Sequence, residues 1–191
     1  GSLTNRLIDS RAGKVIGFEI DHAYQKHLTN LFKDYPKFTL ISGDFLKEFE
    51  NAVKTHLASG QKPVITGNLP YYITTPIMEK IFTGTCGFSR AAFMMQKEVA
   101  DRIKAGPGNK IYGALSVAVQ YYCTVDKVAS VPRSVFVPQP NVDSIVLRLN
   151  IRKEKAVQVE DEKLFFDCVK AGFGQRRKTL LNSLQNVKGN F

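Results

Sequence analysis

Short apolar runs alternate with longer charged stretches along the first 150 residues, and this alternation restricts the fold more than any other feature. Four runs have the length and the β-branched or apolar content of buried strands: Val15–Ile20, Phe38–Ser42, Pro63–Gly67 and Ala91–Met95. The stretches between them are compatible with helices. Strands that alternate with helices form a parallel sheet with crossover helices, so the sequence predicts an α/β fold.

Two later runs, Cys123–Val131 and Ser144–Ile151, are separated by a proline-rich loop, Pro132–Pro140. We expect them to pair as antiparallel strands. The second run alternates cleanly, which predicts that one of its faces is buried and carries Ile145, Leu147, Leu149 and Ile151.

The composition changes after Ile151. Arg152–Lys155 is a charged linker, and Asp161–Leu184 has the apolar spacing of helices. We therefore place a boundary near residue 153, with a main domain over 1–152 and the start of a small helical domain over 153–191. One helix pair is too little for an independent core, so we expect that a C-terminal portion is missing.

The beginning of the chain is also unusual. A helix-like segment, Asn5–Ser10, precedes the first strand-like run, and no strand precedes that helix. A βαβ unit needs such a strand, so we expect the natural protein to begin upstream. Gly1-Ser2 could instead be a cloning remnant.

Charge and cysteine content narrow the class of protein. The chain has 27 Lys and Arg against 17 Asp and Glu, a net charge of +10, which favours a polyanionic partner, nucleic acid before an acidic membrane surface. The three cysteines have no paired spacing, so neither a disulfide framework nor a zinc site is indicated. No run is long enough for a membrane span and no signal peptide opens the chain, so we expect a soluble, cytoplasmic protein without a membrane partner.

Two acidic residues follow predicted strands, where open α/β sheets bind ligands. Glu19 lies at the carboxyl end of the first run, the position of the acid that holds ribose hydroxyls in nucleoside-binding folds. Asp44 follows the second run, where it could accept from an adenine amino group while Phe45 covers a base face. The alternative for both acids is structural, since acids at strand ends commonly cap the next helix.

The tetrapeptide Asn68-Leu69-Pro70-Tyr71 follows the third run. A threonine cap and Pro76 at the first helical position predict a helix directly after it. The tetrapeptide resembles the catalytic motif of adenine-N6 and related amino methyltransferases. A loop of no special role is the alternative, but the order of Glu19, Asp44 and Asn68, each after its own strand, argues against it.

The chemistry of an exocyclic amine explains these residue types. Its lone pair is delocalised into the ring, so it attacks a methyl sulfonium poorly until that conjugation is weakened. The Asn68 side-chain oxygen and the Pro70 carbonyl could accept the two amino hydrogens and aim the nitrogen, while Tyr71 offers a stacking surface for an extruded base. Neither a metal nor a covalent nucleophile is required.

Further motifs follow in a consistent order: Met95–Val99, Ala105–Pro107, Tyr112–Ser116, Gln120–Cys123, Val131-Pro132, Phe136–Ser144 and Phe173–Leu180. With the sites above, they make the chain resemble the KsgA family of small-subunit ribosomal RNA adenine dimethyltransferases from Gly1 to about Asn186. The resemblance implies a Rossmann-like class I S-adenosylmethionine-dependent methyltransferase fold with a small, truncated C-terminal helical domain.

The resemblance also implies roles for particular residues. Glu19 would bind the ribose of S-adenosylmethionine, Asp44 its adenine amino group, and Asn68 would lie between cofactor and target base. The remaining cofactor contacts would be Gly1, Ile20 and Phe45. Tyr71 and Phe136 would sandwich the target adenine, although Phe136 could instead be a core residue. The residues expected to face RNA phosphates, or else to form a solvated helix face, are Arg176, Arg177 and Lys178.

The expected partners are small-subunit ribosomal RNA and the immature small ribosomal subunit, bound by a monomer. Family members carry a glycine-rich loop after a first strand, of which only the tail, Gly1–Thr4, is present. We therefore predict that this chain binds S-adenosylmethionine weakly or not at all and is inactive by itself.

Three other functions remain open at this stage. The chain could be an Erm-type enzyme that methylates large-subunit RNA, although the Met95–Val99 and Tyr112–Cys123 segments look more KsgA-like. A DNA adenine methyltransferase more often begins the tetrapeptide with aspartate. An assembly factor that binds precursor ribosomal RNA, with methylation secondary, would also fit the basic charge.

Overall fold

The computed structural model describes residues 1–70, 73–83, 87–175, 177–185 and 187. Contacts within the chain define two compact units, residues 1–63 with 83–87 and residues 64–82 with 88–191. Each unit is described by itself.

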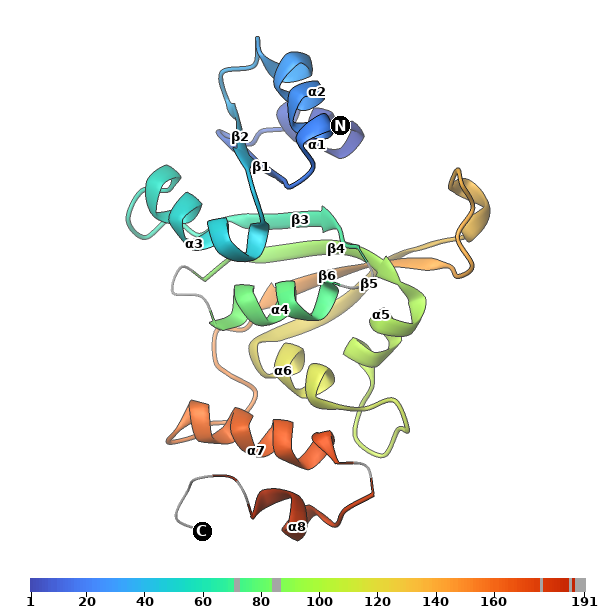
Figure 1. The fold of residues 1–191 in the computed structure, drawn as a ribbon. Helices are drawn as coiled ribbons and strands as arrows, with labels where there is room; N and C mark the ends of the chain where they lie inside the picture. The colour runs from blue at the N-terminus through green and yellow to red at the C-terminus, as the bar shows by residue number, and fades with distance from the viewer. Residues whose placement is uncertain (71–72, 84–86, 176, 186, 188–191) are drawn as a thin grey trace. The chain divides into compact units, whose positions relative to one another are not determined.

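The first unit is a two-stranded parallel sheet with three helices (Figure 1). β1 (Val15–Glu19) pairs with β2 (Phe38–Ser42), from Val15 opposite Phe38 to Glu19 opposite Ser42. The helices are α1 (Ser2–Ile8), α2 (His22–Phe32) and α3 (Phe45–His56). Because α2 connects two parallel strands, it forms the crossover predicted from the alternating pattern. A small apolar core joins the two strands to α1 and α2 and contains Ile8, Val15, Phe32 and Phe38.

Aspartates start both helices that follow these strands. The Asp21 carboxylate accepts the backbone N–H groups of Ala23 at 2.7 Å and Tyr24 at 3.3 Å, at the start of α2. Asp44 accepts the N–H of Leu46 at 2.9 Å, at the start of α3. The first N–H groups of a helix have no partner within the helix, and these carboxylates supply one. The two helices therefore begin directly at the carboxyl ends of β1 and β2.

The second unit contains a four-stranded sheet in the order β3-β4-β6-β5. Its strands are β3 (Val64–Asn68), β4 (Arg90–Gln96), β5 (Cys123–Val131) and β6 (Ser144–Ile151). β3 and β4 are parallel, whereas β6 runs antiparallel to both β4 and β5. The expected antiparallel pair is thus confirmed, and the expected parallel strands form two separate ladders, one in each unit.

Five helices and one 3₁₀ turn are described in this unit: α4 (Thr74–Thr83), α5 (Lys97–Lys104), α6 (Ala114–Tyr122), α7 (Glu162–Gly174), α8 (Leu180–Leu184) and η1 (Arg133–Val135). Figure 1 shows α4, α5 and α6 on one side of the sheet. Along β6, Ile145, Leu147 and Leu149 are buried as predicted, whereas Ile151 at the strand end is half-buried. The core of the unit lies between these strands and helices.

One expected boundary is wrong. Pro76 was predicted at the first helical position, but α4 begins at Thr74, so Pro76 is the third residue of the helix. The Ile77 N–H donates to the Ile73 carbonyl at 3.0 Å, so the helical hydrogen bonds begin two residues earlier than Pro76 suggests. Proline is tolerated there because a first-turn N–H has no acceptor within the helix.

Side chains of α6 satisfy the carboxyl end of α5. The Gln120 amide donates to the carbonyls of Ile103 and Ala105, both at 2.8 Å, and the Ser116 hydroxyl donates to the Arg102 carbonyl at 2.5 Å. The last carbonyls of a helix lack partners within it, so these bonds lock α5 to α6. They explain why serine and glutamine stand in two of the motifs singled out above.

We expect Gln120→Leu to lower the free energy of unfolding by about 2–4 kcal/mol, because it leaves two carbonyls near the core without a donor. Urea unfolding of the 191-residue chain measures this. The matched control is Gln158→Leu, at an exposed position. Equal losses in the two variants would show that the Gln120 amide does not stabilise this junction.

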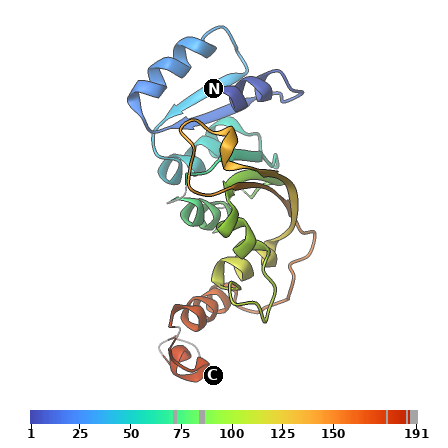
Figure 2. The same ribbon diagram turned by 90° about the vertical axis from the view of Figure 1, so that its right-hand side faces the viewer.

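An aromatic cluster holds α7 against α6. Tyr121 stacks on Phe165 with ring centroids 5.2 Å apart, and Tyr122 stacks on Phe166 at 5.7 Å. The Tyr122 hydroxyl and the Lys155 ammonium both donate to the Glu162 carboxylate, at the first residue of α7. Figure 2 shows α6, α7 and α8 following one another along the unit. α7, which follows residue 153 in the chain, packs on α6, which precedes it. The domain boundary expected near residue 153 stays a prediction.

The Glu162 carboxylate predicts a loss of stability in acid. Burial raises its pKa, but the hydrogen bonds from Lys155 and Tyr122 outweigh burial, so the pKa lies below its ordinary value. A carboxylate whose pKa is depressed by folding stabilises the protein above its unfolded pKa, about 4.3, and this contribution disappears as the pH falls through the folded pKa. We expect Glu162→Gln to be less stable than the parent at pH 7, and the difference to disappear as the pH falls through the depressed pKa of Glu162.

Thermal unfolding of both proteins between pH 3 and pH 8 tests this expectation. Glu160→Gln, two residues earlier and exposed, is the control and should follow the parent throughout. A difference between parent and Glu162→Gln that does not change with pH would contradict it.

Candidate functional site

The carboxyl ends of β1 and β2 bring two of the predicted acids to one edge of the first unit. Glu19 is the last residue of β1 and pairs with Ser42, the last residue of β2. The Gly43 N–H then donates to the Glu19 carbonyl at 2.9 Å, so the turn that leads to Asp44 lies directly beside the end of β1. Gly43 has φ of +156°, the edge of the region that favours glycine.

Both acids are half-buried and each already accepts one backbone hydrogen bond. Glu19 Oε1 accepts the N–H of Asp21 at 2.9 Å, and Asp44 Oδ1 accepts the N–H of Leu46. The structural role considered for Asp44, a helix cap, is therefore real. A carboxylate has about four acceptor positions, so each side chain keeps capacity for ligand hydroxyl or amino donors. The backbone bonds fix how these acids are presented.

Of the other predicted cofactor contacts in this unit, Ile20 and Phe45 lie next to the two acids, whereas Gly1 lies elsewhere. Ile20 and Phe45 directly follow Glu19 and Asp44; Ile20 is 63% exposed, and Phe45 packs edge-on against Phe18 with centroids 5.1 Å apart. Gly1 lies instead against Leu31, in the last turn of α2, whereas Glu19 lies beside the first turn. The structure does not bring Gly1 to the acids, and its role as a cofactor contact remains a prediction.

In the second unit, Asn68 is the last residue of β3 and is exposed, whereas the next residue, Leu69, is fixed in the core. Leu69 is buried, 6% exposed, and its N–H donates to the Met94 carbonyl at 2.9 Å, which continues the β3–β4 ladder by one residue. Asn68 is thus the last residue of the strand, paired with Met94, and its side chain is exposed at this edge of the sheet.

The Pro70 carbonyl is engaged within the chain. It accepts the Ile73 N–H at 3.2 Å and the Thr74 hydroxyl at 3.1 Å. Thr74 is only 2% exposed, so its hydroxyl is a buried polar group. Tyr71, the last residue of the motif, lies outside the described residues.

The loop that carries Phe136 projects from the same edge of the sheet as Asn68. β4 runs parallel to β3 and ends at Gln96, which pairs with Ser144 at the start of β6; Ser144 in turn pairs with Val131 at the end of β5. The loop from Val131 to Ser144 thus leaves and returns at the edge where β3 and β4 end. Phe136 is half-buried in this loop, directly after η1.

Asp143 closes the neck of the loop. Its carboxylate accepts the Arg133 N–H at 2.9 Å, and its backbone carbonyl accepts the N–H of Lys97 at 2.9 Å, at the start of α5. A cleft of about 580 Å³ opens beside this neck, lined by Lys97, Glu98, Asp101, Ile111, Arg133, Asn141, Val142 and Asp143. The loop is therefore tied to the sheet edge at both ends.

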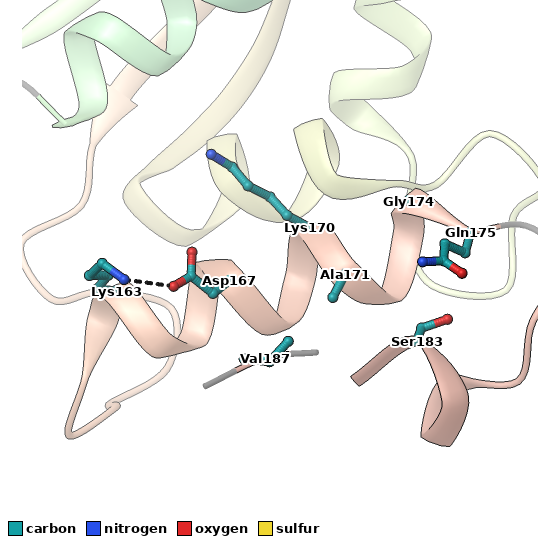
Figure 3. Close-up of a pocket in the computed structure, with 8 residues that line it drawn as sticks. All are labelled: Lys163, Asp167, Lys170, Ala171, Gly174, Gln175, Ser183 and Val187. Carbon is teal, nitrogen blue, oxygen red and sulfur yellow. Dashed lines mark hydrogen bonds and ion pairs between the residues drawn. The ribbon is translucent and has the colours of Figure 1, made fainter. Parts of the chain in front are cut away.

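The predicted RNA contacts lie in the helical segment. Arg177 and Lys178 are exposed in the turn between α7 and α8, and Arg176 lies outside the described residues. A second cavity, about 550 Å³, opens between these helices (Figure 3). Its Lys163 pairs with Asp167 at 2.9 Å, so this positive charge is partly neutralised. The cavity contains none of the predicted site residues.

The buried thiol and the possible metal ligands of the described residues were also compared with the requirements of catalysis. Burial raises the pKa of the Cys123 thiol to about 12, which keeps it protonated. Cys86 lies outside the described residues. Within those residues no group of three His, Cys, Asp or Glu side chains could hold a metal ion, and no helix is long and apolar enough to cross a membrane.

Comparisons with known proteins identify the fold and the family of the chain. A solved dimethyladenosine transferase from Plasmodium falciparum superposes with a TM-score of 0.77 at 30% identity, covering 96% of this chain and 63% of that one. The 23S rRNA methyltransferase ErmE superposes with a TM-score of 0.71 at 26% identity, covering 96% of this chain and 70% of its own. The chain therefore has the Rossmann-like fold of class I S-adenosylmethionine-dependent methyltransferases, as expected.

The sequence family described as ribosomal RNA adenine dimethylase matches residues 1–190. Ribosomal RNA small subunit methyltransferase A of Bacillus cytotoxicus is 47% identical over 192 residues, covering all of this chain and 65% of the relative. The chain belongs to the ribosomal RNA adenine dimethylase family. It spans about two thirds of the length of the curated relatives it matches.

Two residues with structural roles at the site were missed by sequence reasoning. Thr74 was considered only as a helix signal, although it reaches back to the motif. Asp143 was part of a quoted motif without a role, although it closes the Phe136 loop. The sequence signal was weak in both cases, because each bond joins residues whose contact depends on how a turn or loop closes.

Proposed function

We propose that this protein, at the full length of its relatives, is an enzyme that transfers methyl groups from S-adenosylmethionine to the N6 amino groups of adjacent adenines near the 3′ end of small-subunit ribosomal RNA. It also acts in the biogenesis of the small subunit. The observation that carries this proposal is the exposed Asn68 at the carboxyl end of β3, whose backbone is followed by the buried and hydrogen-bonded Leu69.

The Asn68 side chain acts on the target amine. Its oxygen accepts one amino hydrogen, which draws the nitrogen out of conjugation with the ring. The Pro70 carbonyl, expected from the sequence to accept the other, already accepts the Ile73 N–H and the Thr74 hydroxyl, so the proposal rests on Asn68. Phe136 covers one face of the extruded base, and we assign the other face to Tyr71. The rigid strand end positions the nitrogen, so little reorganisation is needed when the base arrives.

The residues of the first unit fit the nucleoside part of the cofactor. Glu19 has acceptor positions for the two ribose hydroxyls, and Asp44 has one for the adenine amino group. The exposed Ile20 and the partly exposed Phe45 supply apolar surface next to them. When bound, S-adenosylmethionine supplies an activated methyl group on a sulfonium, so the chain needs no nucleophile of its own.

The choice of small-subunit RNA over large-subunit RNA follows the degree of similarity. The relative named for the small subunit is 47% identical to this chain, whereas the 23S methyltransferase is 26% identical. The exposed Arg177 and Lys178 supply positive charge for an RNA backbone. We assign the same RNA, within the immature small subunit, as the binding partner.

Methyl transfer to three acceptors tests the proposal. The extended enzyme consists of the 191 residues joined to the segments that the Bacillus cytotoxicus relative has outside the matched region. We expect it to label immature small subunits with radioactive methyl groups, and to label naked 23S RNA and duplex DNA at less than about a hundredth of that rate. Preferred labelling of 23S RNA would favour an Erm-type function, and preferred labelling of DNA would overturn the RNA assignment.

One variant, Tyr71→Ala, distinguishes a role in methylation from a role in ribosome assembly. If maturation of small subunits in cells depends on methyl transfer, Tyr71→Ala should impair both. A Tyr71→Ala protein that restores maturation but transfers no methyl groups would show that RNA binding is the main function.

The 191-residue chain should bind S-adenosylmethionine weakly or not at all, because the glycine-rich backbone cradle expected for the methionine part of the cofactor is not in this sequence. Titration calorimetry of the chain beside the extended enzyme measures this. We expect a dissociation constant at least about 100-fold higher for the chain. Equal affinities would show that the acids and their neighbours suffice.

A further inference from the structure

The cleft of about 580 Å³ beside the neck of the Phe136 loop contains none of the residues assigned above to the target base or to the cofactor. Segments that are distant in the chain form it: the first turns of α5, Ile111, and both ends of the loop. The backbone N–H of Lys97 donates to the Asp143 carbonyl at 2.9 Å, which ties α5 to the loop. A cleft of this size accommodates a ligand as large as a nucleotide.

The cleft lies next to the expected position of the target base. Asn68 pairs with Met94 in the β3–β4 ladder, and Lys97 follows Met94 by three residues. Three residues of extended chain span at most about 10 Å. Figure 1 shows the start of α5 and the loop between β5 and β6 at the same end of the sheet. A nucleotide joined to the target adenine is therefore within reach of the cleft while the adenine lies at Asn68.

One cation of the cleft is available for a phosphate. The charges of α5 are neutralised within the helix, since Lys97 pairs with Asp101 at 2.5 Å and Glu98 with Arg102 at 2.9 Å. Arg133 differs, because its guanidinium donates at 3.2 Å to a neutral main-chain carbonyl of the same loop. A guanidinium has five N–H donors, so most of them remain for phosphate oxygens.

Two apolar side chains of the cleft are accessible to a base. Ile111 is 43% exposed and Val142 is 39% exposed, and both belong to the lining. The Asp143 carboxylate, which accepts the Arg133 N–H at 2.9 Å, leaves the lining close to neutral as a whole. A nucleotide matches these features, because its base has a flat apolar face and its phosphate needs only one cation.

We propose that this cleft binds the nucleotide that adjoins the target adenine in the RNA: Arg133 holds its phosphate, and Ile111 and Val142 contact its base. This inference rests on the proposed function and names a part of the substrate beyond the reacting base. The contact does not involve the reacting atoms, so its loss appears in KM rather than in kcat.

Arg133→Gln in the extended enzyme tests the phosphate contact. We expect KM for immature small subunits to rise about fivefold, kcat to stay within about twofold of the parent, and the salt dependence of log Kd for the subunit to become shallower by about 1. A merely loosened loop would leave that salt dependence unchanged. Arg133→Lys keeps the charge and should keep the salt dependence of the parent. Lys153→Gln is the matched control, because it removes an exposed cation beyond the opposite end of β6.

The base contact is measured on the 191-residue chain without methyl transfer. Adenosine 5′-monophosphate should shift the NMR signals of the Ile111 and Val142 methyl groups through the ring current of its base. The methyl groups of Val157, which is exposed and outside the cleft, should stay unchanged. Ribose 5-phosphate, which has no base, should shift neither set, and Arg133→Gln should reduce the shifts caused by the nucleotide.

The results separate this inference from the proposed function. If the parent enzyme labels small subunits while Arg133→Gln has the KM and salt dependence of Lys153→Gln, the cleft holds no phosphate and the inference is wrong. It is also wrong if the nucleotide shifts the Val157 methyl groups as much as those of Ile111 and Val142, or shifts none of them. A parent enzyme that labels no small subunits would overturn the proposed function, whereas the methyl shifts would still decide whether the cleft binds a nucleotide.

Discussion

Replacing Asn68 with alanine in the extended enzyme is expected to lower kcat for methyl transfer to immature small subunits by about 100- to 1000-fold, the range observed when one preorganised polar group is removed from an active site. The structural reason is that Asn68 stands exposed at a strand end, where the buried Leu69 fixes the backbone on its carboxyl side. Removing its amide should not disturb the fold. We therefore expect the melting temperature to change by less than about 2 °C.

Asn68→Asp is the informative companion variant. It keeps side-chain oxygens that can accept from an amine, so it should lose less activity than the alanine variant. Asn51→Ala, at an exposed position of α3, is the control, because it makes the same substitution away from the predicted site. Initial rates with radioactive S-adenosylmethionine measure all three. An Asn68→Ala enzyme as fast as the parent would remove the basis of the proposed mechanism.

Glu19→Ala is expected to weaken binding of S-adenosylmethionine to the extended enzyme by about 100-fold, because two hydroxyl groups of the ribose would lose a charged acceptor. The carboxylate is fixed by the Asp21 N–H, and its backbone by the parallel pairing of β1 with β2. The loss should appear in Kd, measured by calorimetry, and should leave the rate at saturating cofactor within about threefold of the parent.

Glu19→Gln keeps one neutral acceptor oxygen and should fall between the parent and the alanine variant. Asp34→Ala removes an exposed carboxylate of the same unit and controls for the change in net charge. Since the Glu19 side chain also accepts a backbone N–H, the thermal stability of each variant is recorded as well. Affinities of Glu19→Ala and Asp34→Ala that differ by less than threefold would rule out the ribose contact.

The local pattern was sufficient for most elements. The runs at Phe38–Ser42, Cys123–Val131 and Ser144–Ile151 are strands with the predicted bounds, and helices follow Asp161 as expected. Strands are short runs of β-branched and apolar residues, so their sequences carry the information locally. Pro76 shows the limit of this reasoning, because a proline is tolerated at any position of a first helical turn and so does not specify where the helix begins.

The sequence by itself determined the family, the α/β class and the order Glu19, Asp44, Asn68, because each of these depends on residue types and on short spacings. Only the tertiary structure decided which atoms meet: Thr74 with the Pro70 carbonyl, and Asp143 with the neck of the Phe136 loop. These bonds depend on how turns close and on which strand lies next to which. Strand order in a sheet is fixed by packing between distant segments, and spacing along the chain does not contain it.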